Sequence, residues 1–253
     1  MGVTNFITAS DASAEAFKTA NLLKLLSVNA LIYGERGTGK LTLARYILPT
    51  ASVIDASNFD ELLDALQSSS EVIITHIEQI PNMQTLQQQI AQHNVRVIAT
   101  ASDTYANELI EEIFTIRVYL PSLGERLEDV PELQAEYLND AIAIFGESSR
   151  VELSKIDPDL SENAISIRRQ IFFNYLLSNI TEEELMRVTE DYLYDRLGSN
   201  NDYREYLHLY EVPLIKAGLK RFKSQLQLSE KLGLNRNTLR KKIVENKEYN
   251  LDE

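Results

Sequence analysis

Residues 34–40 have the types and the spacing of a loop that binds phosphate groups. They read Gly-Glu-Arg-Gly-Thr-Gly-Lys; an apolar run precedes them and a helix-compatible stretch, 41–48, follows. Glycines let backbone N–H groups surround phosphate oxygens, and the lysine adds a positive charge. We therefore expect a nucleotide to contact Gly34, Glu35, Arg36, Gly37, Thr38, Gly39, Lys40 and Leu41.

The residue after the lysine departs from this motif. It is Leu41, where a serine or threonine hydroxyl would reach magnesium, and Thr42 comes one residue late. The expected ligand is ATP or ADP, with Mg²⁺ held weakly or not at all. A glycine-rich turn that binds no ligand is the alternative.

The sequence matches the requirements for nucleotide hydrolysis less well than those for phosphate binding. Hydrolysis needs a carboxylate that holds the metal, a group that orients water, and positive charge beside the transferred phosphate. The strand predicted at 72–77 contains Thr75 and His76 where carboxylates are needed. Glu78 lies two residues beyond His76, on the same face of an extended strand, and could act as a substitute. We assign no catalytic residue.

The carboxyl-terminal segment has the pattern of a helix pair that binds DNA. Gly233 permits a tight turn and Asn235 can cap the second helix. One apolar side is predicted from Leu226, Leu228, Leu232, Leu234, Leu239 and Ile243. The candidate DNA-binding residues are Asn235, Arg236, Asn237, Thr238, Arg240, Lys241 and Lys242.

These candidates divide by chemistry. Forked or amide side chains suit base edges, whereas a flexible point charge suits phosphates. Base contacts are expected from Arg236, Asn237, Thr238 and Arg240, and phosphate contacts from Lys220, Lys241 and Lys242. A solvated basic helix at a chain end is the alternative.

The charge distribution separates this segment from the rest of the chain. The 253 residues carry a net charge of −13, whereas 213–247 carry +8, which leaves −21 on the remainder. A basic segment at one end of an acidic chain is typical of nucleic-acid binding.

The predicted elements show how these residues are positioned. Up to residue 120, short apolar runs alternate with amphipathic segments, which predicts an α/β fold with a five-stranded parallel sheet. Beyond it, apolar residues recur at helical spacing. We expect strands at 30–33, 52–55, 72–77, 95–100 and 114–120, and helices at 132–145, 165–177, 182–197 and 203–222.

Three domains follow from this order. They are a nucleotide-binding domain at 1–120, a helical lid at 121–197 and a helix-turn-helix domain at 203–253, with the small polar stretch 198–202 as a linker. Thr181 and Glu184 have the spacing of a capping box, which predicts where the helix 182–197 begins.

Composition excludes several classes of protein. The chain has no cysteine and three histidines, so a dedicated metal site is not expected. It has neither an apolar run of about 20 residues nor the basic start of a signal peptide. We expect a cytoplasmic protein that does not enter a membrane.

Several segments together resemble the sigma-54-dependent enhancer-binding activators of the nitrogen-regulator type. GERGTGK stands where that family has GESGTGK, LPSLGERLEDVP at 120–131 resembles its LPPLRERREDIP, and 211–243 is similar to its Fis-type ending. The resemblance implies an AAA+ type sheet with a helical lid, followed by an all-α Fis-type helix-turn-helix domain. It also implies that the helix 203–222 pairs two subunits.

The chain departs from this family where the family contacts its sigma factor and where neighbouring subunits complete the site. Only 31 residues separate Lys40 from Val72, too few to include the GAFTGA loop. The segment 103–113, where arginine fingers are expected, has four acidic residues and no basic one. We therefore regard the chain as a degenerate member.

The two sensor positions of the family also differ. Ser102 replaces a polar amide at sensor I, and Ile165 replaces an arginine at sensor II. Arg168 and Arg169 lie about one turn further along and could share the helix face.

The sequence thus predicts a DNA-binding transcriptional regulator whose AAA+ domain binds nucleotide with impaired hydrolysis. The expected partners are double-stranded DNA, further copies of the chain in a homodimer or larger homo-oligomer, and related AAA+ activators. One alternative is an active ATPase in which Glu78 and Arg168 or Arg169 replace lost groups. Another is an interaction protein that modulates complete activators.

Overall fold

The computed structural model of the chain describes residues 6–102, 108–146 and 151–249. The chain forms two compact units, Met1–Ile180 and Thr181–Glu253, and each is described by itself. Within the described ranges, no helix has the length and apolar character needed to cross a membrane.

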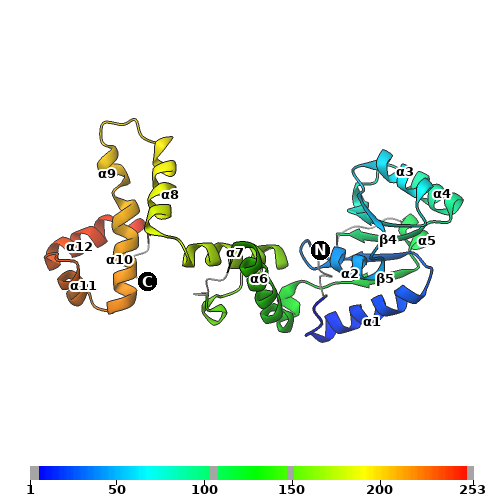
Figure 1. Cartoon of the computed structure of the whole chain (residues 1–253), viewed down its shortest axis with the longest axis horizontal. Coiled ribbons are helices and arrows are strands. Elements are labelled where there is room, and N and C mark those ends of the chain that lie inside the picture. The colour runs from blue at the N-terminus through cyan, green and yellow to red at the C-terminus, as the bar shows by residue number, and fades with distance from the viewer. Residues whose placement is uncertain (1–5, 103–107, 147–150, 250–253) are drawn as a thin grey trace. The chain divides into compact units, whose positions relative to one another are not determined.

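A five-stranded parallel sheet forms the centre of the α/β part of the first unit (Figure 1). Its strands lie in the order β2-β3-β4-β1-β5, and each neighbouring pair is parallel. The predicted α/β fold with five strands is confirmed, and the strand ends differ from prediction by at most two residues. The strands are β1 (Ala30–Tyr33), β2 (Ser52–Asp55), β3 (Glu71–Thr75), β4 (Arg96–Ala101) and β5 (Ile116–Tyr119).

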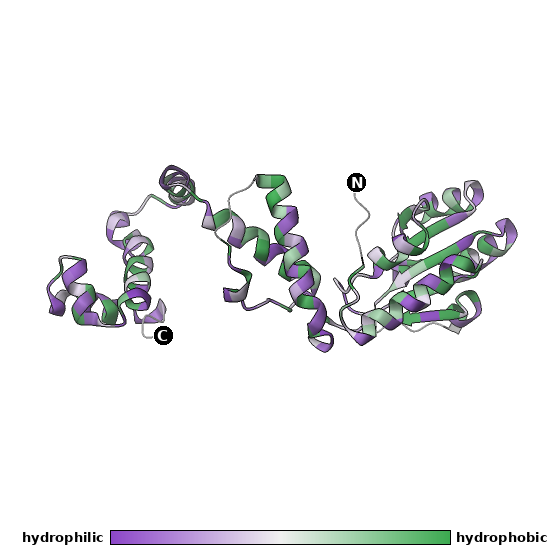
Figure 2. Cartoon of the chain, turned by 60° about the horizontal axis from the view of Figure 1, so that its bottom comes forward, coloured by the Kyte–Doolittle hydropathy of each residue, from purple (hydrophilic) through white to green (hydrophobic). Residues whose placement is uncertain are grey.

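Helices cover both faces of this sheet because alternate residues of each strand point to opposite sides. Ile32 and Ile98 pack with α1 and α2, whereas Leu31 and Val97 pack with α3, α4 and α5. Figure 2 shows the strands as predominantly hydrophobic ribbons between these helices. The helices are α1 (Asp11–Leu25), α2 (Lys40–Ile47), α3 (Phe59–Ser68), α4 (Met83–His93) and α5 (Glu108–Ile113).

A helical part follows β5 in the same unit. It contains α6 (Val130–Phe145) and α7 (Ala164–Ser178), which pack around Ile167 and Ile171. Pro131 lies in the first turn of α6, where its missing N–H has no partner to lose. The lid was predicted to extend to residue 197, but the first unit ends at Ile180 and the next helix belongs to the second unit.

In the second unit, the regular elements of the described residues are all helices. The predicted capping box at its start is confirmed, since Thr181 and Glu184 exchange both bonds. Three of the helices, α10 to α12, surround a small apolar core formed by Val212, Ile215, Leu228, Leu239 and Ile243. The helices are α8 (Glu182–Tyr194), α9 (Asp202–Tyr206), α10 (His208–Phe222), α11 (Gln225–Lys231) and α12 (Arg236–Glu245).

The prediction of one long helix at 203–222 is wrong. The helix is interrupted at Leu207, between α9 and α10. Nδ1 of His208 lies 2.7 Å from the carbonyl oxygen of Glu205, which a backbone N–H would bind in a continuous helix. A side chain therefore takes the place of one backbone hydrogen bond at the break.

Candidate functional site

The loop between β1 and α2 has a backbone that only glycine can adopt at two of its positions. Gly34 and Gly37 have φ of +146° and +81°. A Cβ on Gly34 would lie 2.2 Å from the carbonyl oxygen of Leu120, and one on Gly37 would lie 2.4 Å from that of Glu162. These glycines let the loop fit between the end of β5 and the start of α7.

The carbonyl oxygens of 34–38 all accept hydrogen bonds. Lys40 Nζ donates to the first two, those of Gly34 and Glu35, at 2.6 and 2.5 Å, which places the ammonium group across the loop. The donors to the next three carbonyls come from outside the loop. They are Asn163 Nδ2 to Arg36 at 2.9 Å, the N–H of Ala164 to Gly37 at 3.1 Å, and Arg126 Nη2 to Thr38.

This anchoring determines where the loop N–H groups point. In a trans peptide the C=O and the following N–H point in opposite directions. Because the carbonyls of Arg36, Gly37 and Thr38 are held from outside, the N–H groups of Gly37, Thr38 and Gly39 point away from the donors that hold them. An array of this kind, with a lysine ammonium beside it, is suited to bind phosphate oxygens.

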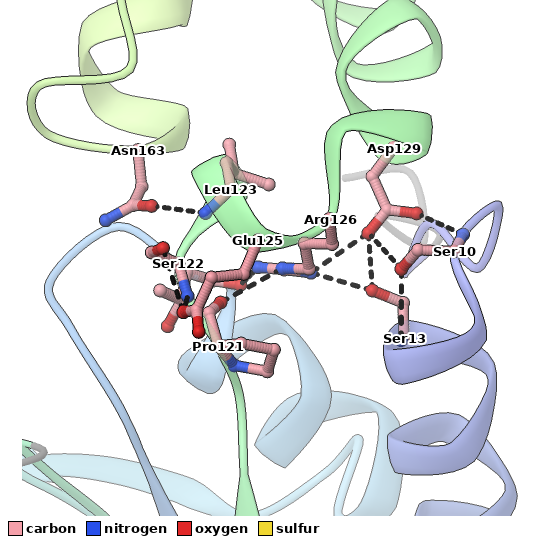
Figure 3. A network of polar contacts seen from close by, with 10 residues as sticks. Ser10, Ser13, Pro121, Ser122, Leu123, Glu125, Arg126, Asp129 and Asn163 are labelled. Carbon is pink, nitrogen blue, oxygen red and sulfur yellow. Dashed lines mark hydrogen bonds and ion pairs between the residues drawn. The ribbon is translucent and has the colours of Figure 1, made fainter.

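Arg126 lies at the centre of a buried polar network beside the loop (Figure 3). Its Nη1 lies 2.8 Å from Ser13 Oγ and 3.2 Å from Asp129 Oδ2, and its Nε donates to the carbonyl of Pro121 at 3.1 Å. Asp129 also accepts from the N–H of Ser10 at 2.8 Å. Burial lowers the pKa of the guanidinium, and the Asp129 carboxylate opposes this shift. The network joins the loop, α1 and the start of α6.

Asn163 holds the loop from the helical part, a role that the sequence did not reveal. Its side-chain oxygen accepts from the N–H of Leu123 at 2.7 Å (Figure 3). Its Nδ2 donates to Glu35 Oε2 at 3.0 Å, in addition to the carbonyl of Arg36. The residue is 2% exposed. Its partners lie 40 to 128 residues away in the sequence, so no local pattern signals them.

The end of β3 has no carboxylate of its own. His76 follows the strand, and its Nδ1 lies 2.7 Å from Asp55 Oδ2 at the end of β2. Since β4 separates β3 from β1, the ring contacts the neighbour on the side away from the phosphate loop. Asp55 also accepts from the N–H and hydroxyl of Ser57, and these bonds together with His76 lower its pKa.

Three residues were considered as substitutes for the missing hydrolytic groups: Glu78, Arg168 and Arg169. One oxygen of Glu78, Oε2, is buried and has no hydrogen-bond partner among the described residues. Arg169 pairs with Glu162 at 3.2 Å, and the guanidinium of Arg168 lies over the ring of Phe172 at 4.8 Å.

Two departures from the family pattern can be followed in the structure. Residues 40–75 are all described and contain only α2, β2, α3 and β3 with short connections, so no long insertion interrupts this region. Within α5, Glu111 pairs with Arg117 and Glu112 accepts from Gln87. The rest of the predicted arginine-finger segment, 103–107, lies outside the described residues.

The outer face of α12 presents most of the predicted DNA-binding residues. Asn235 caps the helix by accepting from the N–H of Asn237 at 2.9 Å, as predicted. Leu239 and Ile243 are buried against α10 and α11, and most of the other residues of the helix are exposed. The exposed candidates are Asn235, Arg236, Asn237, Thr238, Arg240 and Lys241.

Two residues of the carboxyl-terminal segment have surroundings that differ from the prediction. Lys242 is 26% exposed and forms an ion pair with Glu211 of α10, because it shares the inner side of the helix with Leu239 and Ile243. Leu226 was expected on the apolar side but is 51% exposed. Lys241, by contrast, makes only a surface pair with Glu245, at 3.6 Å.

The described residues contain no group of three or more His, Asp or Glu side chains placed to hold a metal ion.

The sequence matches no protein-family model and no curated protein. Its fold is nevertheless shared with solved structures. NtrX from Brucella abortus in complex with ADP has a TM-score of 0.59 at 17% identity, over 97% of this chain and 69% of that one. The complex of the same protein with ATP has a TM-score of 0.58 at 17% identity, over 95% and 69%.

A second protein gives a similar result for part of the chain. Domain III of the replication initiation protein DnaA from Thermotoga maritima has a TM-score of 0.50 at 16% identity, over 75% of this chain and 95% of that one. Together with the strand order and the loop, these likenesses show an AAA+-like α/β fold.

Proposed function

We propose that this chain is a DNA-binding transcriptional regulator whose AAA+-like unit binds ATP or ADP with impaired hydrolysis. The observation that carries the proposal is the outer face of α12. There a capped helix presents Arg236, Arg240 and Lys241 to solvent, while its other face is fixed to α10 and α11. Clustered cations with amide and hydroxyl side chains on one exposed helix face suit a DNA groove.

We propose that the exposed residues of α12 have two different roles. Arg236 and Arg240 are four residues apart and so share a side of the helix, with Asn237 beside them. We assign these residues to base edges and Lys241 and Lys220 to phosphates. Lys242 is assigned to the ion pair with Glu211, which holds α12 on α10.

Nucleotide binding is supported by the geometry of the phosphate loop. Gly37, Thr38 and Gly39 would offer backbone N–H groups to the phosphates, and Lys40 would neutralise their charge. Leu41 has no hydroxyl for a metal ion, so we propose that Mg²⁺ is held weakly or not at all. The structurally similar NtrX was crystallised with ADP and with ATP.

Impaired hydrolysis is supported by the residues at the end of β3. Thr75 supplies no carboxylate, and His76 contacts Asp55 on the side away from the loop. A nucleotide at the loop would therefore meet no carboxylate at the end of β3 that holds a metal or activates water. Bound nucleotide then acts as a structural or signalling ligand.

The subtype and the partners belong to the same proposal. The chain is a degenerate member of the sigma-54 activator type, and it forms a homodimer or a larger homo-oligomer on DNA. Continuous connections through α3 leave no loop to contact a sigma factor. An interaction protein that joins related activators is the second candidate, and its activity would not require DNA.

Calorimetric titration with ADP and ATP, combined with a phosphate-release assay, tests the nucleotide part. We expect the wild type to bind both nucleotides, Lys40→Ala to bind neither, and phosphate release to be equal in the two proteins. The surface variant Lys155→Ala is the control. Release that depends on Lys40 would instead show an active ATPase, with Glu78 as the first candidate for its carboxylate.

A further inference from the structure

Asn163 has a backbone conformation that is costly for any residue except glycine. Its φ is +53° and its ψ is −131°. Residues in such regions persist only where surrounding contacts hold them, and they often mark functional positions. Here the residue is buried, and its side chain bonds the loop on one side and the segment after β5 on the other.

The contacts of Asn163 and of the residue after it involve both the phosphate loop and the start of α7. Its Nδ2 fixes the peptide between Arg36 and Gly37, so that the N–H of Gly37 turns toward the phosphate side. The next residue, Ala164, donates to the carbonyl of Gly37 and begins α7. The loop can therefore keep this shape only while the start of α7 remains docked on it.

We propose that Asn163 is the positioning residue that couples nucleotide binding at the loop to docking of α7. This rests on the proposed nucleotide binding and assigns its conformational consequence. Because the coupling is a free energy shared by two equilibria, it is reciprocal. Bound nucleotide stabilises the docked α7, and loss of the Asn163 amide weakens both nucleotide affinity and docking.

Two substitutions separate the amide from the backbone conformation. Asn163→Gly removes the amide but adopts the positive φ without strain, so its effects report on the lost hydrogen bonds and not on a strained backbone. Asn163→Asp keeps an acceptor for the N–H of Leu123 but replaces the donor with a carboxylate opposite Glu35. Asn174→Ala is the matched control, because that asparagine bonds within α7, to the carbonyl of Gln170.

The full chain is titrated with ADP, and hydrogen exchange is followed with and without ADP in the loop and in α7. We expect Asn163→Gly and Asn163→Asp to bind ADP about tenfold more weakly, the effect of one lost hydrogen bond. Both should exchange faster in the loop without ADP, and in both ADP should protect α7 less. Asn174→Ala should match the wild type.

The outcomes distinguish this inference from the proposed function. If Asn163→Gly binds ADP like the wild type and its loop exchanges at the wild-type rate, the coupling role is wrong while nucleotide binding stands. If the wild type does not bind ADP, the proposed nucleotide function fails. The exchange rates without ADP still decide whether Asn163 holds the loop.

Discussion

At the scale of the residue, Arg126 and Asp129 form a buried ion pair in the first unit. The side chains are 4% and 0% exposed. We predict that Arg126→Ala lowers the free energy of unfolding by about 3–5 kcal/mol, because Asp129 is left as an uncompensated buried charge. Urea unfolding measures this loss. Lys155→Ala is the control, because removal of its exposed ion pair should change the free energy of unfolding by less than about 1 kcal/mol. A loss for Arg126→Ala as small as that of the control would contradict the role of the network.

A second residue-scale prediction concerns pH. Hydrogen bonds from Ser57 and the contact with His76 lower the pKa of Asp55 below its unfolded value of about 3.9. The ionised carboxylate therefore stabilises the fold above about pH 4, and this contribution is lost as the pH falls through the folded pKa. Asp55→Asn should be less stable than the wild type at pH 7, and the difference should shrink in acid. Thermal unfolding across pH tests this; a constant difference would refute it, and Asp64→Asn is the control.

Single residues also show what the sequence could and could not predict. The shape of the loop 34–40 was predictable because it depends on local glycines, which a short pattern records. The role of Asn163 was not, because its partners are distant in sequence. The ion pair of Lys242 with Glu211 was not predicted, because it depends on how α12 packs on α10, which charge alone does not record.

At the scale of the element, the close approach of α10 and α11 depends on Gly218. A Cβ there would lie 2.2 Å from Cδ1 of the buried Leu228. We predict that Gly218→Ala destabilises the second unit by about 1–3 kcal/mol, although alanine favours helix, because the core is overpacked. Chemical denaturation followed by circular dichroism measures the change. Adding Leu228→Ala should then cost less than it does in the wild type, and simple additivity would argue against this packing.

Elements were predicted best where tertiary packing and local pattern agree. The strands of the sheet and the capped start of α8 were found because each carries its own signal. The break between α9 and α10 was not, since helical spacing does not record the side-chain contact of His208 with Glu205 that is found there.

The exposed face of α12 yields a prediction of its own. Arg240→Ala should weaken binding mainly to the preferred DNA sequence, by about 1–3 kcal/mol, if its guanidinium contacts a guanine edge. Competition binding across a randomised site library measures the preference, with Lys241→Ala as the comparison. An unchanged sequence preference in Arg240→Ala would assign the base contact to another residue, first of all Arg236.

At the scale of the whole molecule, the chain combines an acidic body with a basic end. The segment 213–247 carries +8 and the remainder −21. In the proposed DNA complex the acidic body would be repelled at long range, so affinity would have to arise from a localised cationic surface. The structure provides such a surface on α12, and an AAA+-like unit whose loop is shaped for phosphates but whose β3 end lacks a carboxylate.

The salt dependence of duplex DNA binding tests the central claim most directly. The affinity of the full chain should fall linearly with salt on logarithmic axes, and Lys241→Ala should reduce the slope by about one unit because one phosphate contact is lost. Lys155→Ala, on the first unit, should leave the slope unchanged. An affinity that is absent, or that does not depend on salt, would contradict the assignment of this chain as a DNA-binding regulator.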